Sequence, residues 1–173
     1  MLPHLGAAFN LAMYLLGNRE EAEDAVQTAY LNALRAFGRF EAGNSAAWIL
    51  TIVRHRCYTL LGQRKRSARV IPFDEESQSE GPSAMAQVFP MPDQATERYL
   101  AVERVRRFIR RLPLEYREVI VLREIEGLAY REIAAIAGIP QGTVMSRLSR
   151  ARQQLKSLLV NDKQKNREQD DAL

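Results

Sequence analysis

The stretch LAYREIAAIAGIPQGTVMSRLSRAR, residues 128–152, constrains the fold more than any other part of the sequence. Its apolar residues recur at helical spacing on both sides of Gly138, which can end a helix, and Pro140, which stops it just beyond. The pattern predicts two short helices joined by a tight turn, with Val144 and Leu148 on the inner face of the second. This is a helix-turn-helix, whose second helix can lie in the major groove of DNA.

The opposite face of that second helix predicts DNA binding. Hydroxyl and arginine side chains gather there, away from Val144 and Leu148, and such groups bond to base edges and phosphates. The alternative is a helical hairpin within a core, with solvated arginines. The combined positions of the glycine, proline and arginine residues favour the DNA-binding interpretation. The candidate residues are Gly142, Thr143, Ser146, Arg147, Ser149 and Arg150.

Composition excludes several other classes of protein. At 173 residues, 46% of them hydrophobic, the chain can form one domain or two small ones, and its pI near 9.5 suits an acidic partner. No apolar run approaches a membrane span, and the start of the chain lacks the basic region of a signal peptide. Cys57 is the single cysteine, which excludes a disulfide framework or a cysteine-rich zinc site. We expect no metal, no cofactor and a cytoplasmic location.

Helical spacing also organises the first half of the chain. It predicts a helix over residues 5–16 and then a long amphipathic helix, capped by Asn18 and running from Ala22 to about Phe37. The polar face of the long helix could simply be solvated, but the apolar Leu31 on that face indicates a partner. The predicted buried stripe comprises Ala22, Ala25, Val26, Ala29, Tyr30, Ala33, Leu34 and Phe37.

A third helix is predicted from about Ser45 to Leu61, and the charge changes abruptly there. No acid occurs between Glu41 and Asp74, whereas basic and aromatic residues accumulate. Such interleaving suits single-stranded or distorted nucleic acid. A charge run alone is usually a solvated face, but the absence of neighbouring acids favours a polyanionic partner. The residues are Arg54, His55, Arg56, Tyr58, Arg64, Lys65, Arg66 and Arg69.

Residues 70–97 reverse the sign of the charge and predict a linker. They are acidic, contain four prolines and several serines, and carry no lysine or arginine. Beyond them the sequence predicts a helix ending near Leu112, another opened by Pro113 and ended by Gly127, and then the helix-turn-helix. Together these helices would form a four-helix bundle. The polar tail beyond Asn161 is predicted to be disordered.

Three stretches together resemble the extracytoplasmic-function (ECF) group of sigma factors, the small alternative sigma factors of bacterial RNA polymerase. They are GNREEAEDAVQTAYLNALRAF, WILTIVRHRCYTLLGQRKR and LPLEYREVIVLREIEGLAYREIAAIAGIPQGTVMSRLSRARQQL, in the order in which the family has them. The resemblance covers nearly the whole chain apart from the acidic linker and the tail.

The resemblance implies an all-α fold of two small helical domains joined by a flexible acidic linker. Residues 1–66 would form the domain like sigma region 2, residues 67–93 the linker and residues 94–161 the domain like region 4, a four-helix bundle ending in the helix-turn-helix. Residues 162–173 would form a polar tail. The implied function is that of a non-enzymatic sigma factor, which binds core polymerase, recognises the minus-35 and minus-10 promoter elements and promotes strand opening.

The resemblance also assigns roles to residues. The second helix of the chain would bind core polymerase through Asp24, Gln27, Leu31 and Arg35. The third would bind the minus-10 element through Trp48, His55, Arg56, Tyr58, Arg64, Lys65 and Arg66. The helix-turn-helix residues named above would read the minus-35 element. The chain departs from common family residues at Thr28, His55, Thr59 and Met145.

The implied partners are core RNA polymerase, promoter DNA as duplex and as melted strand, and an anti-sigma factor, with no membrane insertion. The nearest rival is an autonomous helix-turn-helix transcription regulator. Such proteins usually carry a sensor domain, whereas the first half of this chain shows basic helices. An enzyme is disfavoured because no nucleophile–base pair, phosphate-binding glycine loop or ligand cluster is found, and only two histidines are present.

Overall fold

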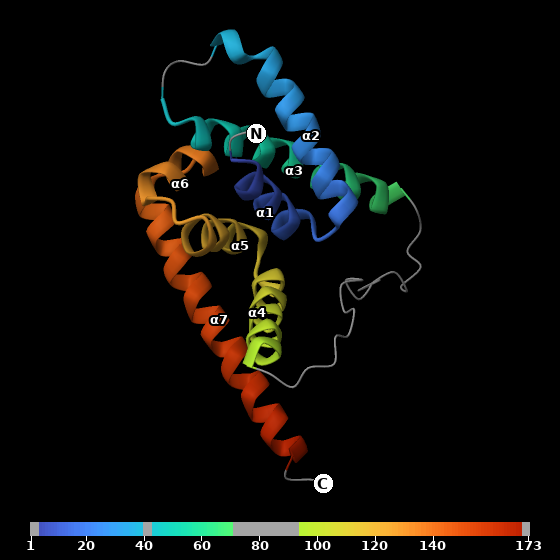
Figure 1. Cartoon of the computed structure of the whole chain (residues 1–173), viewed down its shortest axis with the longest axis vertical. Coiled ribbons are helices and arrows are strands. Elements are labelled where there is room, and N and C mark those ends of the chain that lie inside the picture. Colours follow the sequence, from blue (N-terminus) through green and yellow to red (C-terminus); the bar gives the residue numbers. More distant parts are fainter. Residues whose placement is uncertain (1–3, 40–42, 71–93, 171–173) are drawn as a thin grey trace.

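A computed structural model of the chain describes residues 4–39, 43–70 and 94–170 (Figure 1). Every regular element in these ranges is a helix, which confirms the predicted all-α class. The elements are α1 (Leu5–Leu16), α2 (Arg19–Arg35), η1 (Phe37–Arg39), α3 (Ser45–Val70), α4 (Gln94–Arg111), α5 (Leu114–Ile120), η2 (Val121–Ile125), α6 (Tyr130–Ala137) and α7 (Gln141–Asp170). The element η1 is a single 3₁₀ turn, and η2 is a π-helical turn that continues α5.

The first helical unit consists of α1, α2 and α3, which all pack on one another. Gly17 ends α1 in the left-handed conformation, at φ 72°, and its N–H bonds to the Met13 carbonyl. Asn18 then caps α2, because its side-chain oxygen accepts the Glu21 N–H at 3.0 Å. The core between the helices is built from small and branched apolar residues, including Ala8, Leu11, Leu15, Ala22, Ala25, Leu50, Val53 and Cys57.

The second helical unit consists of α4 to α7. The π-helical turn arises where the Glu126 N–H bonds to the Val121 carbonyl five residues back, at 3.1 Å. Gly127, at φ 68°, then lets the chain leave the helix, as predicted. The core of this unit lies between α5, η2, α6 and α7, and its fully buried side chains include Val119, Ile120, Leu122, Ile133, Ile136 and Leu148.

The two units pack against each other. α3 contacts α6, and α1 contacts α5, η2 and α4, so that α1 lies at the middle of the molecule (Figure 1). The sequence predicts two domains separated by an acidic linker; residues 71–93 of that linker lie outside the described residues. The described helices on its two sides nevertheless lie in direct contact.

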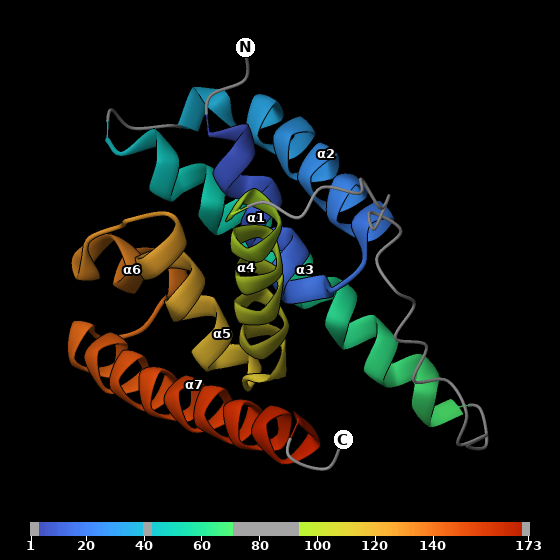
Figure 2. The ribbon, with the colours of Figure 1, turned by 60° about the horizontal axis from the view of Figure 1, so that its bottom comes forward.

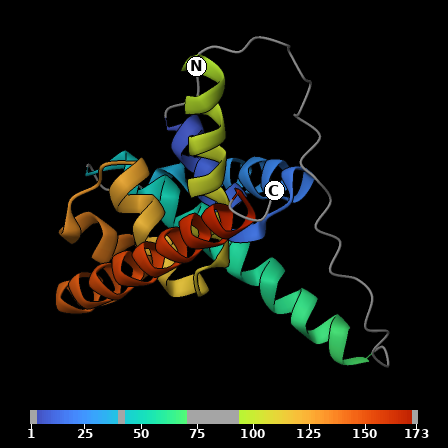
Figure 3. The ribbon, with the colours of Figure 1, turned by 90° about the horizontal axis from the view of Figure 1, so that it is seen from below.

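Two helices extend further than predicted. α3 continues to Val70 and its last turns project away from the body of the molecule (Figures 2 and 3). α7 continues to Asp170, so the prediction of disorder beyond Asn161 is wrong as far as that residue. Asp162 on α7 forms an ion pair with Arg104 of α4 at 3.6 Å, which supports the helix as far as that residue. Helical runs of polar residues are stabilised by such partners.

Candidate nucleic-acid interface

The helix-turn-helix is formed by α6 and α7. Gly138 ends α6 at φ 66° and its N–H bonds to the Ala134 carbonyl, while the Pro140 carbonyl accepts the first N–H bonds of α7. The predicted inner face of the second helix is correct: Val144, Leu148 and Ala151 are buried, and Leu155 is half-buried. This packing fixes which side of α7 faces outward.

The outer face of α7 presents polar side chains to solvent. Gly142, Ser146, Ser149 and Arg150 are exposed, and Thr143 and Arg147 are half-buried. Within the described part of the chain, neither Arg147 nor Arg150 forms a hydrogen bond or ion pair. Ser146 donates a hydrogen bond to the Thr143 carbonyl at 3.0 Å. The structure thus brings the predicted residues together on one helical face, with two cationic side chains available for an anionic partner.

The basic residues of α3 divide into an exposed set and a set bonded within the protein. His55, Lys65 and Arg66 are exposed, and Trp48 is half-buried. Within the described residues, Arg66 bonds back to the carbonyl of Gly62 on the same helix, at 3.3 Å. Among the described residues, His55, Lys65 and Arg66 form no side-chain bond to another helix, so they can meet a nucleic acid directly.

The remaining basic and aromatic candidates on α3 contact acids of other helices. Arg56 pairs with Asp24 at 3.3 Å. Arg64 donates to the Glu21 carboxylate at 3.1 Å and to the Leu16 carbonyl at 3.2 Å. No acid neighbours α3 along the chain, but folding brings acids from α2 and α5 to it. The prediction that the basic run lacks counter-charges is therefore wrong.

The acid from α5 is Glu118, which sequence reasoning missed. It is fully buried, with 0% of its surface exposed, and its carboxylate bonds to Arg54 and to the Tyr58 hydroxyl at 3.0 Å. Burial of the ring and the adjacent carboxylate raise the pKa of Tyr58 to about 12, so the phenol keeps its proton and donates it. A sequence signal was present, because Glu118 stands four residues from both Leu114 and Leu122 on the inward stripe of its helix.

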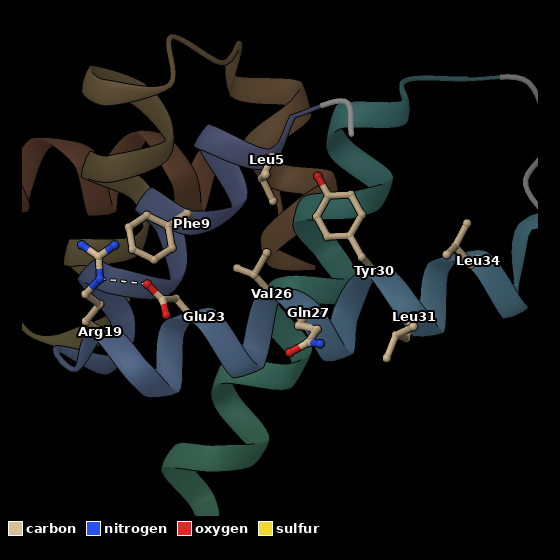
Figure 4. A pocket seen from close by; sticks show the side chains of 9 residues that line it. All are labelled: Leu5, Phe9, Arg19, Glu23, Val26, Gln27, Tyr30, Leu31 and Leu34. Carbon is tan, nitrogen blue, oxygen red and sulfur yellow. Dashed lines mark ion pairs between the residues drawn. The ribbon is translucent and has the colours of Figure 1, made fainter. Parts of the chain in front are cut away.

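The exposed face of α2 carries the candidate partner-binding residues. Asp24, Gln27 and Arg35 are exposed, and so is Leu31, at 49%. Beside them α1 and α2 form an open, mostly apolar groove of about 490 Å³ (Figure 4). An ion pair between Arg19 and Glu23, at 2.8 Å, closes one end. The groove is lined by Leu5, Phe9, Arg19, Glu23, Val26, Gln27, Tyr30, Leu31 and Leu34.

The prediction that Leu34 and Phe37 belong to the buried stripe is wrong. Leu34 is 65% exposed and Phe37 is 64% exposed, whereas the stripe from Ala22 to Ala33 is buried as predicted. α1 begins at Leu5, so the last turn of α2 runs past it (Figure 1). Helical periodicity predicts which side chains share a face, but it does not predict how far the neighbouring helix extends.

Family models match both helical units. Residues 2–67 match "Sigma-70 region 2", and residues 102–155 match "Sigma-70, region 4". The ECF RNA polymerase sigma factor EcfG of Rhodopseudomonas palustris is 34% identical over 152 residues, which cover 87% of this chain and 78% of the relative. The chain belongs to the ECF group of the sigma-70 family. It is an RNA polymerase sigma factor, as the resemblance predicted.

Other relatives of this sigma factor differ in length. The ECF RNA polymerase sigma-E factor of Escherichia coli is 36% identical, over 77% of this chain and 71% of the relative. ECF RNA polymerase sigma factor SigE of Mycolicibacterium smegmatis is 30% identical over 91% of this chain, which spans 59% of the length of that relative.

Solved sigma factor structures share the arrangement of the helices. The sigma factor RpoE of Bartonella quintana, solved in complex with the anti-sigma factor NepR, matches with a TM-score of 0.69 and 32% identity, over 90% of this chain and 91% of the other. CnrH, solved in complex with the cytosolic domain of CnrY, matches with a TM-score of 0.65 and 26% identity, over 92% and 84% of the two chains.

In the described ranges no group of three or more His, Cys, Asp or Glu side chains is placed to hold a metal ion. None of the helices that the structure describes is both long enough and apolar enough to span a membrane.

Proposed function

We propose that this sigma factor binds core RNA polymerase through α2, reads the minus-10 element with α3 and the minus-35 element with α7, and promotes strand opening. The observation that carries the proposal is the outer face of α7. That face belongs to a helix-turn-helix and presents Arg147 and Arg150 without partners in the described part of the chain. The proposed minus-35 contacts are Gly142, Thr143, Ser146, Arg147, Ser149 and Arg150.

The proposed polymerase-binding face is the exposed side of α2. Leu31 supplies an apolar anchor, and Asp24, Gln27 and Arg35 surround it with polar groups. An apolar centre with a polar rim is the usual anatomy of a protein–protein interface. The groove beside this face, between α1 and α2, continues the apolar surface (Figure 4).

The proposed minus-10 contacts lie on α3. His55, Lys65 and Arg66 are exposed and can take part directly. Trp48, Arg56 and Tyr58 are half-buried, and Arg56 and Tyr58 must first exchange a protein partner for DNA. Arg64 holds α1 and α2 together, so its proposed contribution to DNA binding is the smallest of the set.

The domain boundaries and remaining partners are also proposals. Residues 1–66 would act as the region 2-like unit, 67–93 as the linker, 94–161 as the region 4-like unit and 162–173 as a tail, although α3 and α7 each run past these limits. RpoE and CnrH were solved with NepR and CnrY, which supports an anti-sigma factor as a partner of this chain. We propose that the protein acts in the cytoplasm and by binding alone, without catalysis.

Footprinting of promoter DNA with and without core polymerase tests this function. Each DNA-facing surface is small, so the chain alone should bind DNA weakly and with little sequence preference. Docking on core polymerase fixes the separation of the two surfaces and should produce a specific footprint over both elements. Tight, sequence-specific binding by the isolated chain, unchanged by core polymerase, would instead favour the autonomous regulator.

A further inference from the structure

A buried acid connects the two helical units. Glu118 lies on α5 of the second unit and has no exposed surface, yet both side chains that bond to its carboxylate lie on α3 of the first unit. The Arg54 guanidinium bonds to one carboxylate oxygen, and the Tyr58 hydroxyl donates to the other at 3.0 Å. The guanidinium also lies 4.4 Å from the centre of the Tyr58 ring. The three side chains form one compact cluster across the boundary, which we call the Glu118 cluster.

Arg117, the residue before Glu118, also forms hydrogen bonds between the two units. Arg117 donates to the Tyr14 carbonyl of α1 at 3.0 Å, and to the carbonyls of Leu112 and Arg110 in its own unit at 2.9 and 2.5 Å. Two adjacent residues of α5 therefore hold both α1 and α3. Charged donors give the stronger class of hydrogen bond, so α5 supplies the strongest polar contacts between the units.

Two other polar contacts between the units involve exposed side chains. Asn10 of α1 bonds to Glu126 at 3.0 Å, and Asn44, just before α3, bonds to Glu132 of α6 at 2.5 Å. Both contacts are between exposed polar side chains, which contribute little in water. The Arg117 bonds and the Glu118 cluster are thus the strongest of the described polar contacts between the units, and they add to the apolar packing of α1 and α3 on the second unit.

The donors in the Glu118 cluster are of the kind that binds a phosphate. A guanidinium and a hydroxyl both donate to anionic oxygens, and a carboxylate and a phosphate present the same acceptor chemistry. Arg54 and Tyr58 also lie on α3, the helix proposed to hold the minus-10 strand, on either side of the exposed His55. In the closed chain, a carboxylate from the second unit occupies both of these donors.

The exchange of one anion for another is physically feasible. A buried ion pair gains little net stability, because both ions lose their hydration. Replacement of Glu118 by another anion at Arg54 therefore costs little in itself. Closure without that carboxylate is unfavourable, because it would bury the Arg54 guanidinium with no counter-charge.

We propose that Arg54 and Tyr58 bind a backbone phosphate of the melted promoter strand, and that Glu118 occupies the same donors in the closed chain. Closure and strand binding then exclude each other, so the free sigma factor inhibits itself until its units separate. The inference rests on the proposed role of α3 in minus-10 binding.

The first test measures binding of the full chain to a short single-stranded oligothymidylate without polymerase. Glu118→Gln keeps the shape of the side chain but removes its charge, and should tighten binding on the order of tenfold. Glu115→Gln is the matched control, because Glu115 is an exposed acid of the same helix and the change in net charge is equal. Adding Arg54→Gln to Glu118→Gln should abolish the gain. Equal affinities of Glu118→Gln and Glu115→Gln would overturn the proposal.

The second test locks the closed form, in case the first variant is poorly folded. Asn10→Cys with Glu126→Cys places two thiols at a surface contact between the units, where a short thiol cross-linker can join them. The native Cys57 is fully buried and should not compete. The cross-linked chain should lose oligothymidylate binding and promoter opening with core polymerase, and cleavage of the linker should restore both. Full activity of the cross-linked chain would overturn the proposal.

The two tests separate this inference from the proposed function. Oligothymidylate binding is read without polymerase, whereas the function is judged by the footprint that core polymerase adds. If Glu118→Gln releases strand binding and no core-dependent footprint forms, the self-inhibition stands and the sigma mechanism fails. If the footprint forms and the cross-link has no effect, the sigma mechanism stands and the self-inhibition fails.

Discussion

Arg64 of α3 donates a hydrogen bond to the carbonyl of Leu16, the last residue of α1, at 3.2 Å. The last carbonyls of a helix have no partner within it, and a cation is favoured at that end. The same guanidinium bonds to Glu21 in the first turn of α2. One side chain from the predicted DNA-binding run therefore joins all three helices of the first unit.

Replacing Arg64 should affect stability more than DNA binding. Arg64→Ala removes the bonds to Leu16 and Glu21 and should lower the free energy of unfolding by about 1 kcal/mol, a modest effect because both charged side chains are partly exposed. Thermal unfolding followed by circular dichroism would measure it. Lys65→Ala is the control, because Lys65 is exposed and should leave the melting temperature unchanged. Equal melting temperatures of the two variants would contradict the structural role.

Cys57 should report the integrity of the first unit. Burial raises the pKa of its thiol to about 12, so the reactive thiolate is disfavoured in the folded chain. At about pH 8 a thiol reagent should label native protein far more slowly than protein in denaturant. Because the folded pKa lies above the unfolded value, the contribution of this group to stability is complete below the unfolded pKa and is lost as the pH rises through about 12. Rapid labelling of the native chain would contradict the buried position.

The exposed cations Lys65 and Arg66 of α3 should promote strand opening. Lys65→Ala with Arg66→Ala removes two exposed charges and should reduce open-complex formation more than closed-complex binding, because the melted strand follows the basic groups. Permanganate reactivity of promoter thymines reports opening directly. The comparison is made at matched occupancy with wild type. Equal reactivity at that occupancy would show that the two cations only tether duplex DNA.

Arg150 should contribute to reading the minus-35 element. Arg150→Ala should cost about 1–3 kcal/mol of binding by the holoenzyme and relax the preference at one or two bases, if the guanidinium makes a bidentate base contact. Arg152→Ala is a matched control on the same helix, because Arg152 pairs with Glu124 of its own unit at 2.6 Å. Equal weakening on all sequences would make Arg150 a phosphate contact, and no effect would remove it from the interface.

Leu31 should contribute to the binding of this chain to core polymerase. Leu31→Ala removes an exposed apolar side chain and should weaken binding to core polymerase by about 1–2 kcal/mol without destabilising the fold. Val102→Ala on α4 is the control, since Val102 is equally exposed, at 49%, and lies outside the proposed face. Competition for core polymerase against a labelled sigma factor would measure the difference. Equal affinities of the two variants would place the docking face elsewhere.

Local features of the fold were predictable from the sequence because their causes are local. Gly17, Gly127 and Gly138 each adopt the positive φ that ends a helix, and Asn18 caps α2 as its spacing from Glu21 predicts. The outer face of α7 was likewise predictable, because burial of Val144 and Leu148 determines where the intervening side chains point.

The unpredicted features all depend on partners distant in sequence. Arg64 and Tyr58 appear on a basic helix without acids nearby, but their partners lie 43 and 60 residues away. Leu34 fits the apolar repeat, yet no helix of the described chain covers it. Contacts between the two helical units were also not predictable, because helical periodicity describes each segment by itself. The periodicity of apolar residues predicts which side chains share a helical face. Which other helix, if any, covers that face depends on tertiary packing.

The length of α7 has a mechanical consequence. The helix is 30 residues long, which corresponds to about 45 Å at 1.5 Å per residue. Its reading end carries Arg150, and twelve residues further along Asp162 pairs with Arg104 of α4. A continuous helix behaves as a stiff rod, so a twist or tilt imposed at the Arg104 contact also turns the side chains on the outer face of α7. The orientation of the arginines proposed to read the minus-35 element is therefore set in part by the contact between Arg104 and Asp162.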